Sequence, residues 1–170
     1  MKTLVVYYSR DGTTRKVGEE IAKTIGGDVE EIFDTVNRQG ALGYMLAGRD
    51  AMRKKLTTIK ETKKDPNAYD LVVVGTPIWG GNMTPPIRTF LTQNNDRIRN
   101  VAFYCTEGGS GGPNAFKDME EACGKKPKAM LEVTEKNVAT GQYMQKVKKF
   151  AEDLGQIFVV CRGSAAACEP

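Results

Sequence analysis

Three short stretches of this 170-residue sequence combine residue types that could hold a ligand. The first, at positions 9–14, reads Ser-Arg-Asp-Gly-Thr-Thr. Backbone N–H groups at a helix start attract anions, and the hydroxyls of Ser9, Thr13 and Thr14 add further polar contacts. Gly12 lets the backbone fold tightly around an oxyanion. Ser, Asp and Thr are also ordinary helix caps, so this stretch alone fits a capped helix start or a phosphate site.

The second stretch, 76–81, reads Thr-Pro-Ile-Trp-Gly-Gly and contains the only Trp of the chain. It follows a Val-rich run that ends at Gly75, and we predict a loop from Thr76 to Pro86. Trp79 could stack on a flat ring there, and the peptide between Gly80 and Gly81 could change orientation at little steric cost. The alternative is local packing of the Trp against the Pro-rich surface. The two glycines and the position after a strand favour a ligand site.

The third stretch, from Thr106 to Pro113, is dense in glycine. Glycines let a backbone approach the edge of a ligand closely, so that its N–H groups can bond ring carbonyls. Taken by itself, the stretch is more typical of a mobile surface loop.

The elements that must position these stretches alternate between strands and helices. β-branched runs predict strands at Lys2–Tyr8, Asp28–Phe33, Asp70–Gly75, Arg99–Thr106 and Lys128–Val133. Apolar spacings of three and four predict helices at Thr13–Ile25, Gly43–Lys55, Pro86–Thr92, Asn114–Cys123 and Gln142–Leu154. In the helix at Gly43–Lys55, we expect one apolar face made of Tyr44, Leu46, Ala47, Ala51 and Met52.

This alternation predicts an α/β fold, a doubly wound open five-stranded parallel sheet with strand order 2-1-3-4-5. In such sheets, ligands bind beyond the carboxyl ends of the strands, where the strand order reverses. That point lies between strands 1 and 3. The three stretches follow strands 1, 3 and 4, so we expect them to meet there.

Composition narrows the class of protein further. The chain is 40% hydrophobic, carries a net charge of +4 and has no His, so Ser-His-Asp and Cys-His catalysis are excluded. We predict one domain over residues 1–155, and a tail at 156–170 that is either disordered or not native. No apolar run is long enough for a transmembrane helix, and scattered cysteines indicate reduced thiols. We expect a cytoplasmic monomer or homodimer with no metal, nucleic-acid or membrane partner.

The sequence resembles the flavodoxin family in its short form, over nearly the whole chain to Leu154. Ser-x-x-Gly-x-Thr at 9–14 resembles the phosphate loop of that family. Gly-Thr-Pro-Ile-Trp-Gly-Gly at 75–81 resembles its second loop, whose Trp stacks on the flavin. Cys-Thr-Glu-Gly-Gly at 105–109 resembles its third loop. The resemblance implies FMN as cofactor.

It also implies which residues contact FMN. Those of the first loop would hold the phosphate, those of the second would face the ring, and those of the third would line its far edge. Gly80 would supply the peptide that turns toward the flavin N5. The complete expected set is Ser9, Arg10, Asp11, Gly12, Thr13, Thr14, Thr76, Pro77, Ile78, Trp79, Gly80, Gly81, Thr106, Glu107, Gly108 and Gly109.

Three departures from the family pattern shape the expected function. Asp11 replaces a hydroxyl residue, so we expect it to point away from the phosphate as a helix cap, with Arg10 or Arg15 compensating its charge. The third loop lacks the Tyr that often covers the outer flavin face. The chain is also basic where electron-carrying flavodoxins are acidic. The basic segment comprises Arg49, Arg53, Lys54, Lys55, Lys60, Lys63 and Lys64; a solvated surface is favoured over a docking patch for an acidic partner.

The expected function is electron transport by an FMN-binding flavoprotein between redox partner proteins. The alternative is an NAD(P)H-dependent FMN oxidoreductase that acts on a quinone or similar acceptor, since a substrate needs one open face of the flavin. Cys105, close to the expected site, is predicted to be a buried and inert thiol.

Overall fold

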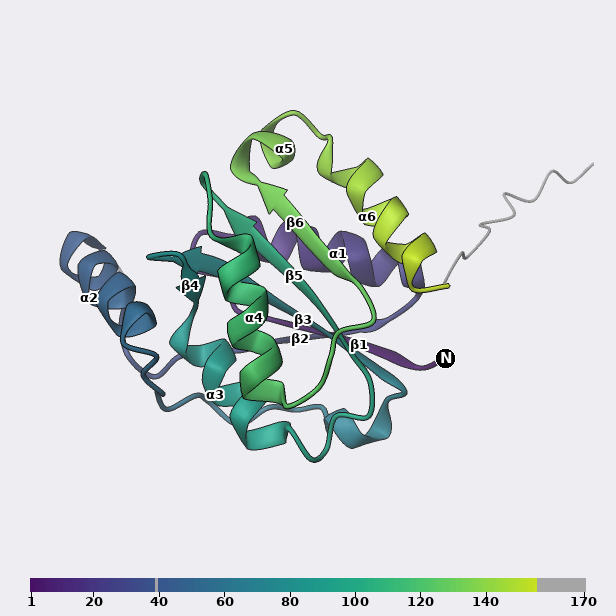
Figure 1. Cartoon of the computed structure of the whole chain (residues 1–170), viewed down its shortest axis with the longest axis horizontal. Helices are drawn as coiled ribbons and strands as arrows, with labels where there is room; N and C mark the ends of the chain where they lie inside the picture. Colours follow the sequence, from purple (N-terminus) through teal and green to yellow (C-terminus); the bar gives the residue numbers. More distant parts are fainter. Residues whose placement is uncertain (39, 156–170) are drawn as a thin grey trace, which may run out of the picture.

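The computed structural model describes residues 1–38 and 40–155, and the predicted tail at 156–170 lies outside these ranges. Parallel strands form one sheet in the order β2-β1-β3-β5-β6, which confirms the predicted doubly wound topology (Figure 1). A further two-residue strand, β4, pairs antiparallel with β3 and was not predicted. The strands are β1 (Thr3–Tyr7), β2 (Asp28–Glu31), β3 (Leu71–Trp79), β4 (Asn82–Met83), β5 (Val101–Glu107) and β6 (Met130–Thr134).

The centre of the sheet is buried on both faces. Every residue of β1 and β5 is buried, and β3 is buried from Leu71 through Thr76. Val5 pairs with Val73 and Val6 with Val74 in the parallel register. β-branched side chains on these strands suit a sheet covered by helices on each side.

One face of the sheet is covered by α1 (Thr13–Ile25) and α6 (Tyr143–Asp153), which pack against each other (Figure 1). The predicted stripes are confirmed, because Val17 and Ile21 of α1 and Val147 and Phe150 of α6 are buried in one cluster. A short helix that the sequence reading missed, α5 (Glu135–Ala139), follows β6 directly.

The other face is covered by α3 (Pro85–Asn94) and α4 (Gly112–Cys123), with α2 (Gly40–Met52) lying beside them (Figure 1). Phe90 of α3 and Met119 of α4 belong to this second core. A 3-10 turn, η1 (Pro66–Ala68), leads into β3. No helix within residues 1–38 and 40–155 has the length and apolar character needed to cross a bilayer.

The predicted apolar face of α2 is confirmed for Ala47 and Ala51 but wrong for its large side chains. Tyr44, Leu46 and Met52 are exposed, and the buried residues are the small ones, Gly43, Ala47 and Ala51. Small side chains at spacings of four let the helix backbone lie close to the body of the protein, and the large apolar side chains then point outward.

An ion-paired cluster fixes α2 to the chain that precedes it. Arg38 Nε donates to Asp34 Oδ2 at 2.6 Å, and Arg38 Nη1 donates to Asp50 Oδ2 at 3.1 Å. The side chains of Arg38 and Asp34 are only 4% and 3% exposed. Asp50 lies near the end of α2, so this buried cluster orients the helix.

The stretch from Thr76 to Pro86, which was predicted to be a loop, is partly strand in the structure. β3 continues past Gly75 to Trp79, and Ile78 and Trp79 then pair with Met83 and Asn82 of β4. The turn between them is Gly80-Gly81, with φ of 55° and 74°. A two-residue hairpin turn of type I′ needs positive φ at both positions, which explains the paired glycines.

Candidate functional site

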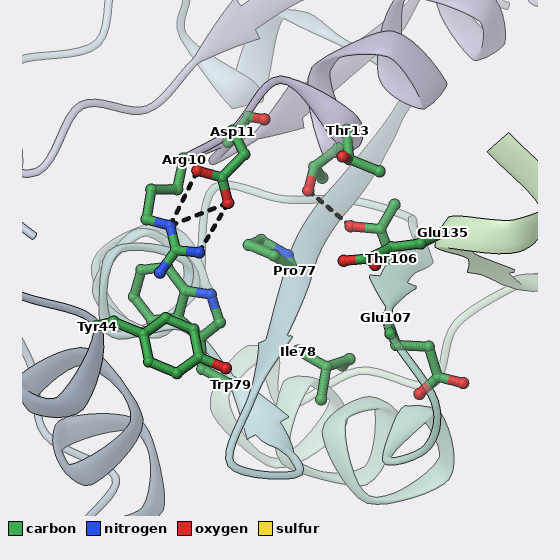
Figure 2. A pocket seen from close by; sticks show the side chains of 13 residues that line it. Arg10, Asp11, Thr13, Tyr44, Pro77, Ile78, Trp79, Thr106, Glu107 and Glu135 are labelled. Atoms are coloured by element: carbon green, nitrogen blue, oxygen red, sulfur yellow. Dashed lines mark hydrogen bonds and ion pairs between the residues drawn. The ribbon is translucent and has the colours of Figure 1, made fainter. Parts of the chain in front are cut away.

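A cavity of about 150 Å³ lies at the carboxyl ends of β1, β3 and β5, where the three stretches meet (Figure 2). Its position agrees with the predicted point at which the strand order reverses. The residues that line it are Ser9, Arg10, Asp11, Thr13, Thr14, Tyr44, Pro77, Ile78, Trp79, Thr106, Glu107, Gly108 and Glu135.

The first loop ends at an open helix N-terminus. Gly12 is the N-cap of α1 with φ of 88°, no side chain caps the helix, and its first turn contains no acidic residue. Ser9 Oγ accepts a hydrogen bond from the Gly12 N–H at 3.1 Å, which folds the loop on itself. The next N–H groups of α1 are therefore available to an anion, and the helix dipole favours one there.

Asp11 does not cap α1, contrary to the expectation from the sequence. Its carboxylate instead accepts from Arg10, with Nη2 to Oδ2 at 2.7 Å and Nε to Oδ2 at 3.0 Å. The hydrogen bond to Asp11 raises the pKa of Arg10 above its ordinary value. Arg15 pairs with Glu31 at 2.7 Å. Arg10 is thus the residue that compensates the charge of Asp11.

The third loop is joined to the first. The hydroxyls of Thr14 and Thr106 lie 2.7 Å apart, and Tyr104 Oη donates to the Thr14 carbonyl at 3.1 Å. Both contacts are buried. The start of α1 and the end of β5 therefore form one wall of the cavity.

The opposite wall is aromatic. Trp79 is only 7% exposed, and its ring meets Tyr8 edge-on with centroids 5.6 Å apart. Arg10 Cζ lies 4.8 Å from the ring centroid of Tyr44 and 5.6 Å from that of Trp79. Figure 2 shows Tyr44 and Trp79 on the same side of the cavity, with the Arg10 guanidinium beside both.

Tyr44 was missed by sequence reasoning. It lies on α2 and is 63% exposed, so the site does hold a second aromatic ring although the third loop has none. The only available signal was a Tyr in an apolar helix, and that helix was predicted to bury it. Its true placement depends on how Gly43, Ala47 and Ala51 set α2 against the body.

The size of the cavity shows what binding of a flat ring requires. Small-molecule pockets typically enclose about 300–1,000 Å³, whereas this one has about 150 Å³. Arg10 covers part of Trp79, so a ring that stacks on that face must displace the guanidinium. Tyr44 is exposed, whereas the Arg10 side chain is only 19% exposed and is held by Asp11.

Glu107 points differently from its neighbours. Figure 2 shows its side chain directed away from the cavity, and Glu107 Oε2 accepts from the Gly112 N–H at 3.2 Å. Thr106 and Gly108 line the cavity on either side of it. Glu135, the second lining residue that the sequence did not indicate, belongs to the unpredicted α5.

Some expected site residues do not line this cavity: Gly12, Thr76, Gly80, Gly81 and Gly109. Thr76 is fully buried, and its hydroxyl accepts from the Thr84 N–H at 3.1 Å, which ties β3 to the start of α3. The Gly80 carbonyl accepts from Asn82 Nδ2 at 2.7 Å within the hairpin. The Gly81 carbonyl likewise accepts a hydrogen bond from Asn114 Nδ2 at 2.8 Å.

Gly80 instead lines a second, mostly apolar cavity of about 490 Å³ on the other side of the aromatic wall. Tyr44 and Trp79 are common to both cavities. The remaining lining residues come from α2 and are Met45, Gly48, Arg49 and Met52.

Cys105 is fully buried at the end of β5. Burial, and then the charges of Glu132 and Glu107, raise the pKa of its thiol well above the ordinary value. The thiolate is the reactive form of cysteine. The arrangement therefore supports the prediction that this thiol is inert.

Comparison with protein families gives a match over nearly the entire described chain. The family model described as Flavodoxin matches residues 2–153. Among curated proteins, none matches the sequence.

Solved structures resemble this fold. A flavoprotein from Lactobacillus acidophilus NCFM, in complex with FMN, is 26% identical with a TM-score of 0.66, over 84% of this chain and 97% of that chain. The oxidised flavodoxin 2 of Bacillus cereus is 18% identical with a TM-score of 0.57, over 91% and 98%. A flavodoxin, WrbA-like protein from Agrobacterium tumefaciens is 13% identical with a TM-score of 0.53, over 91% and 98%. The last two share the fold alone.

Proposed function

This chain belongs to the flavodoxin family, and from that premise we propose that it carries electrons between redox proteins through bound FMN. The observation that carries the proposal is the convergence, in one cavity, of an uncapped helix N-terminus with an aromatic wall. FMN supplies the electron-transfer chemistry when bound, and the protein supplies binding, orientation and electrostatics.

The cavity residues fit the two ends of FMN. The free N–H groups at the start of α1, with Thr13, suit the phosphate. Trp79 offers its ring to the flavin, and the backbone of Thr106 and Gly108 borders the far edge. Asp11 is already paired with Arg10, so its charge does not oppose the phosphate.

We assign partner docking to the α2 surface, defined as the exposed side chains of Leu42, Tyr44, Met45, Leu46, Met52 and Leu56. Contiguous apolar side chains on a soluble protein mark interaction sites. Tyr44 and Met45 also border the apolar cavity beside Trp79. A partner that rests here stands next to the proposed flavin site, and the cavity can receive one of its apolar side chains.

Charge indicates the kind of partner. The exposed cations Arg49, Arg53 and Lys55 flank the α2 surface. Arg49 and Lys55 also lie 3.6 Å and 3.5 Å from Asp50, and Lys54 is engaged with Asp118 at 2.6 Å. In a symmetric dimer formed through this surface, the cations of one copy would face those of the other and repel them. An acidic redox protein would be attracted instead, and this attraction would steer its approach.

A second candidate function is an NAD(P)H-dependent FMN oxidoreductase acting on a quinone or similar acceptor. The apolar cavity of about 490 Å³ favours it, because its lining of Tyr44, Met45 and Met52 suits a flat uncharged ring. Trp79 lines both this cavity and the first one. A ring bound here would meet Trp79 rather than a flavin in the first cavity, which disfavours direct hydride transfer and favours the carrier.

Anaerobic mixing of the FMN-loaded protein with NADH or NADPH distinguishes the two functions. For the carrier, the flavin absorption band persists with both nucleotides and bleaches with dithionite. Rapid bleaching by either nucleotide would contradict the carrier and establish the reductase.

The docking assignment is tested separately, with a plant-type [2Fe–2S] ferredoxin as an acidic probe and the Met45→Glu variant. We expect electron exchange to slow on the order of tenfold in Met45→Glu, and to slow with added salt in the unaltered protein. Met144→Glu is the matched control, because Met144 is similarly exposed but lies on α6. Equal rates in the two variants would contradict the α2 surface.

A further inference from the structure

A pair of carboxyl groups lies behind the third loop. Glu107 ends β5 and Glu132 lies on β6, and the carboxyl groups of both lie against Gly112 at the start of α4. The parallel register pairs Glu107 with Thr134 and Cys105 with Glu132. The two acids are therefore diagonal neighbours on the same face of adjacent strands.

The pair is packed against the start of α4. Glu107 is 4% exposed and accepts the Gly112 N–H. A Cβ added at Gly112 would overlap the Glu132 carboxylate, so the Glu132 side chain lies directly against the start of α4. The third loop runs from Gly108 to Gly111, and Glu107 thus bonds the residue at the far end of the loop that it begins.

Few charges near the pair can neutralise it. Lys146 of α6 faces the site, but its Nζ donates to the Glu132 carbonyl at 2.9 Å. From β5 the buried Cys105 thiol faces both acids, and from α5 Glu135 lies near Gly108. Among residues 1–38 and 40–155, no ion pair joins a cation to either carboxyl group.

Two carboxyl groups can hydrogen-bond to each other only if one of them carries a proton. Burial, then the hydrogen bond to Glu132 and its charge, raise the pKa of Glu107 above the ordinary range. The raised pKa agrees with the geometry, since two carboxyl groups placed close together cannot both ionise easily.

We propose that Glu107 and Glu132 share one proton that clamps the third loop, and that loss of this proton loosens the loop and weakens FMN binding. The proposal rests on the proposed function and adds its regulation by pH. Glu107 is a positioning residue, because its side chain points away from the cavity and acts through the backbone of the loop.

The sign of the pH dependence follows from the raised pKa. Between the ordinary pKa of a Glu and the raised pKa of Glu107, the native protein binds more protons than the unfolded chain. Stability is therefore full below the ordinary pKa and falls as pH rises through the raised one. If loss of the proton loosens the loop, the affinity for FMN falls as pH rises above the raised pKa of Glu107 in the FMN-free protein, by up to about tenfold per pH unit for one proton.

The test compares the dissociation constant for FMN across pH 5 to 9 in the unaltered protein and in Glu107→Gln. A Gln there copies the protonated acid: its carbonyl accepts from Gly112 and its amide donates to Glu132. We expect the ratio of the two constants to grow with pH, with Glu107→Gln binding more tightly at high pH. This ratio cancels the titration of the FMN phosphate.

Glu152→Gln is the matched control, since Glu152 is an exposed acid on α6 that neither lines the cavity nor belongs to the pair. It should follow the pH profile of the unaltered protein. A constant ratio between Glu107→Gln and the unaltered protein would overturn the proposal.

Urea unfolding of the FMN-free protein gives a second readout. Stability should fall more steeply with rising pH in the unaltered protein and in Glu152→Gln than in Glu107→Gln. If the protein bound no FMN, the proposed function would fail while this comparison still reported the shared proton. Parallel stability profiles in all three proteins would show that no proton is shared.

Discussion

The hydroxyl oxygens of Thr14 and Thr106 lie 2.7 Å apart in the buried interior, although 92 residues separate them in the chain. Thr14 belongs to the first turn of α1 and Thr106 to the end of β5. One hydrogen bond therefore joins the loop with the open helix N-terminus to the loop that borders the far edge of the cavity. The two halves of the proposed FMN site keep their spacing through this contact.

Replacing either threonine by Val should destabilise the protein. Val keeps the shape of Thr but leaves the partner hydroxyl buried without a hydrogen bond, which costs about 1–3 kcal/mol. In Thr14→Val/Thr106→Val no polar group is left unpaired, so the double variant should lose less than the sum of the single variants. Urea unfolding of all four proteins measures this coupling. Additive losses would show that the contact does not join the loops.

Trp79 should contribute to FMN binding through its ring. We compare Trp79→Phe with Trp79→Leu, because both shorten the side chain at a position that is 7% exposed and only Phe keeps an aromatic face. Aromatic stacking is worth about 0.5–1.5 kcal/mol beyond burial, so Leu should bind FMN about 2- to 13-fold more weakly than Phe. Fluorescence titration gives both dissociation constants. Equal values would mean that Trp79 only packs against Tyr8.

Arg38 should be the residue on which the placement of α2 depends. Arg38→Met leaves the carboxylates of Asp34 and Asp50 without their buried cation, and breaking such a pair costs about 3–5 kcal/mol. Arg15→Met is the control, because Arg15 is 46% exposed and its bond to Glu31 should be worth about 0–1 kcal/mol. Thermal unfolding of both variants tests this contrast. A similar small loss in both would show that the Arg38 cluster does not hold α2.

The sheet and most helices could be predicted because their signals are local. The apolar spacing of Val17, Ile21 and Ile25 and the Gly pair after them give α1 its observed bounds. The Val-rich run that starts at Leu71 marks the central strand. Strand order then follows from the general handedness of parallel connections, which brings the three loops to one edge.

The missed parts of the site depend on contacts between distant elements. Tyr44 borders the cavity only because α2 lies on its small residues and is held through Arg38. Glu107 was expected to face the cofactor, but its partners Gly112 and Glu132 come from a helix and a neighbouring strand. The Gly80-Gly81 hairpin had a local signal, since paired glycines between apolar residues favour a type I′ turn.

The most direct test of the account is the FMN content of the purified protein, followed by titration of the cofactor-free protein with FMN and with riboflavin. We predict a yellow protein that releases one FMN per chain on denaturation. Riboflavin should bind more weakly than FMN, because it lacks the phosphate that the start of α1 would hold. A colourless protein that takes up no added FMN would contradict the central claim.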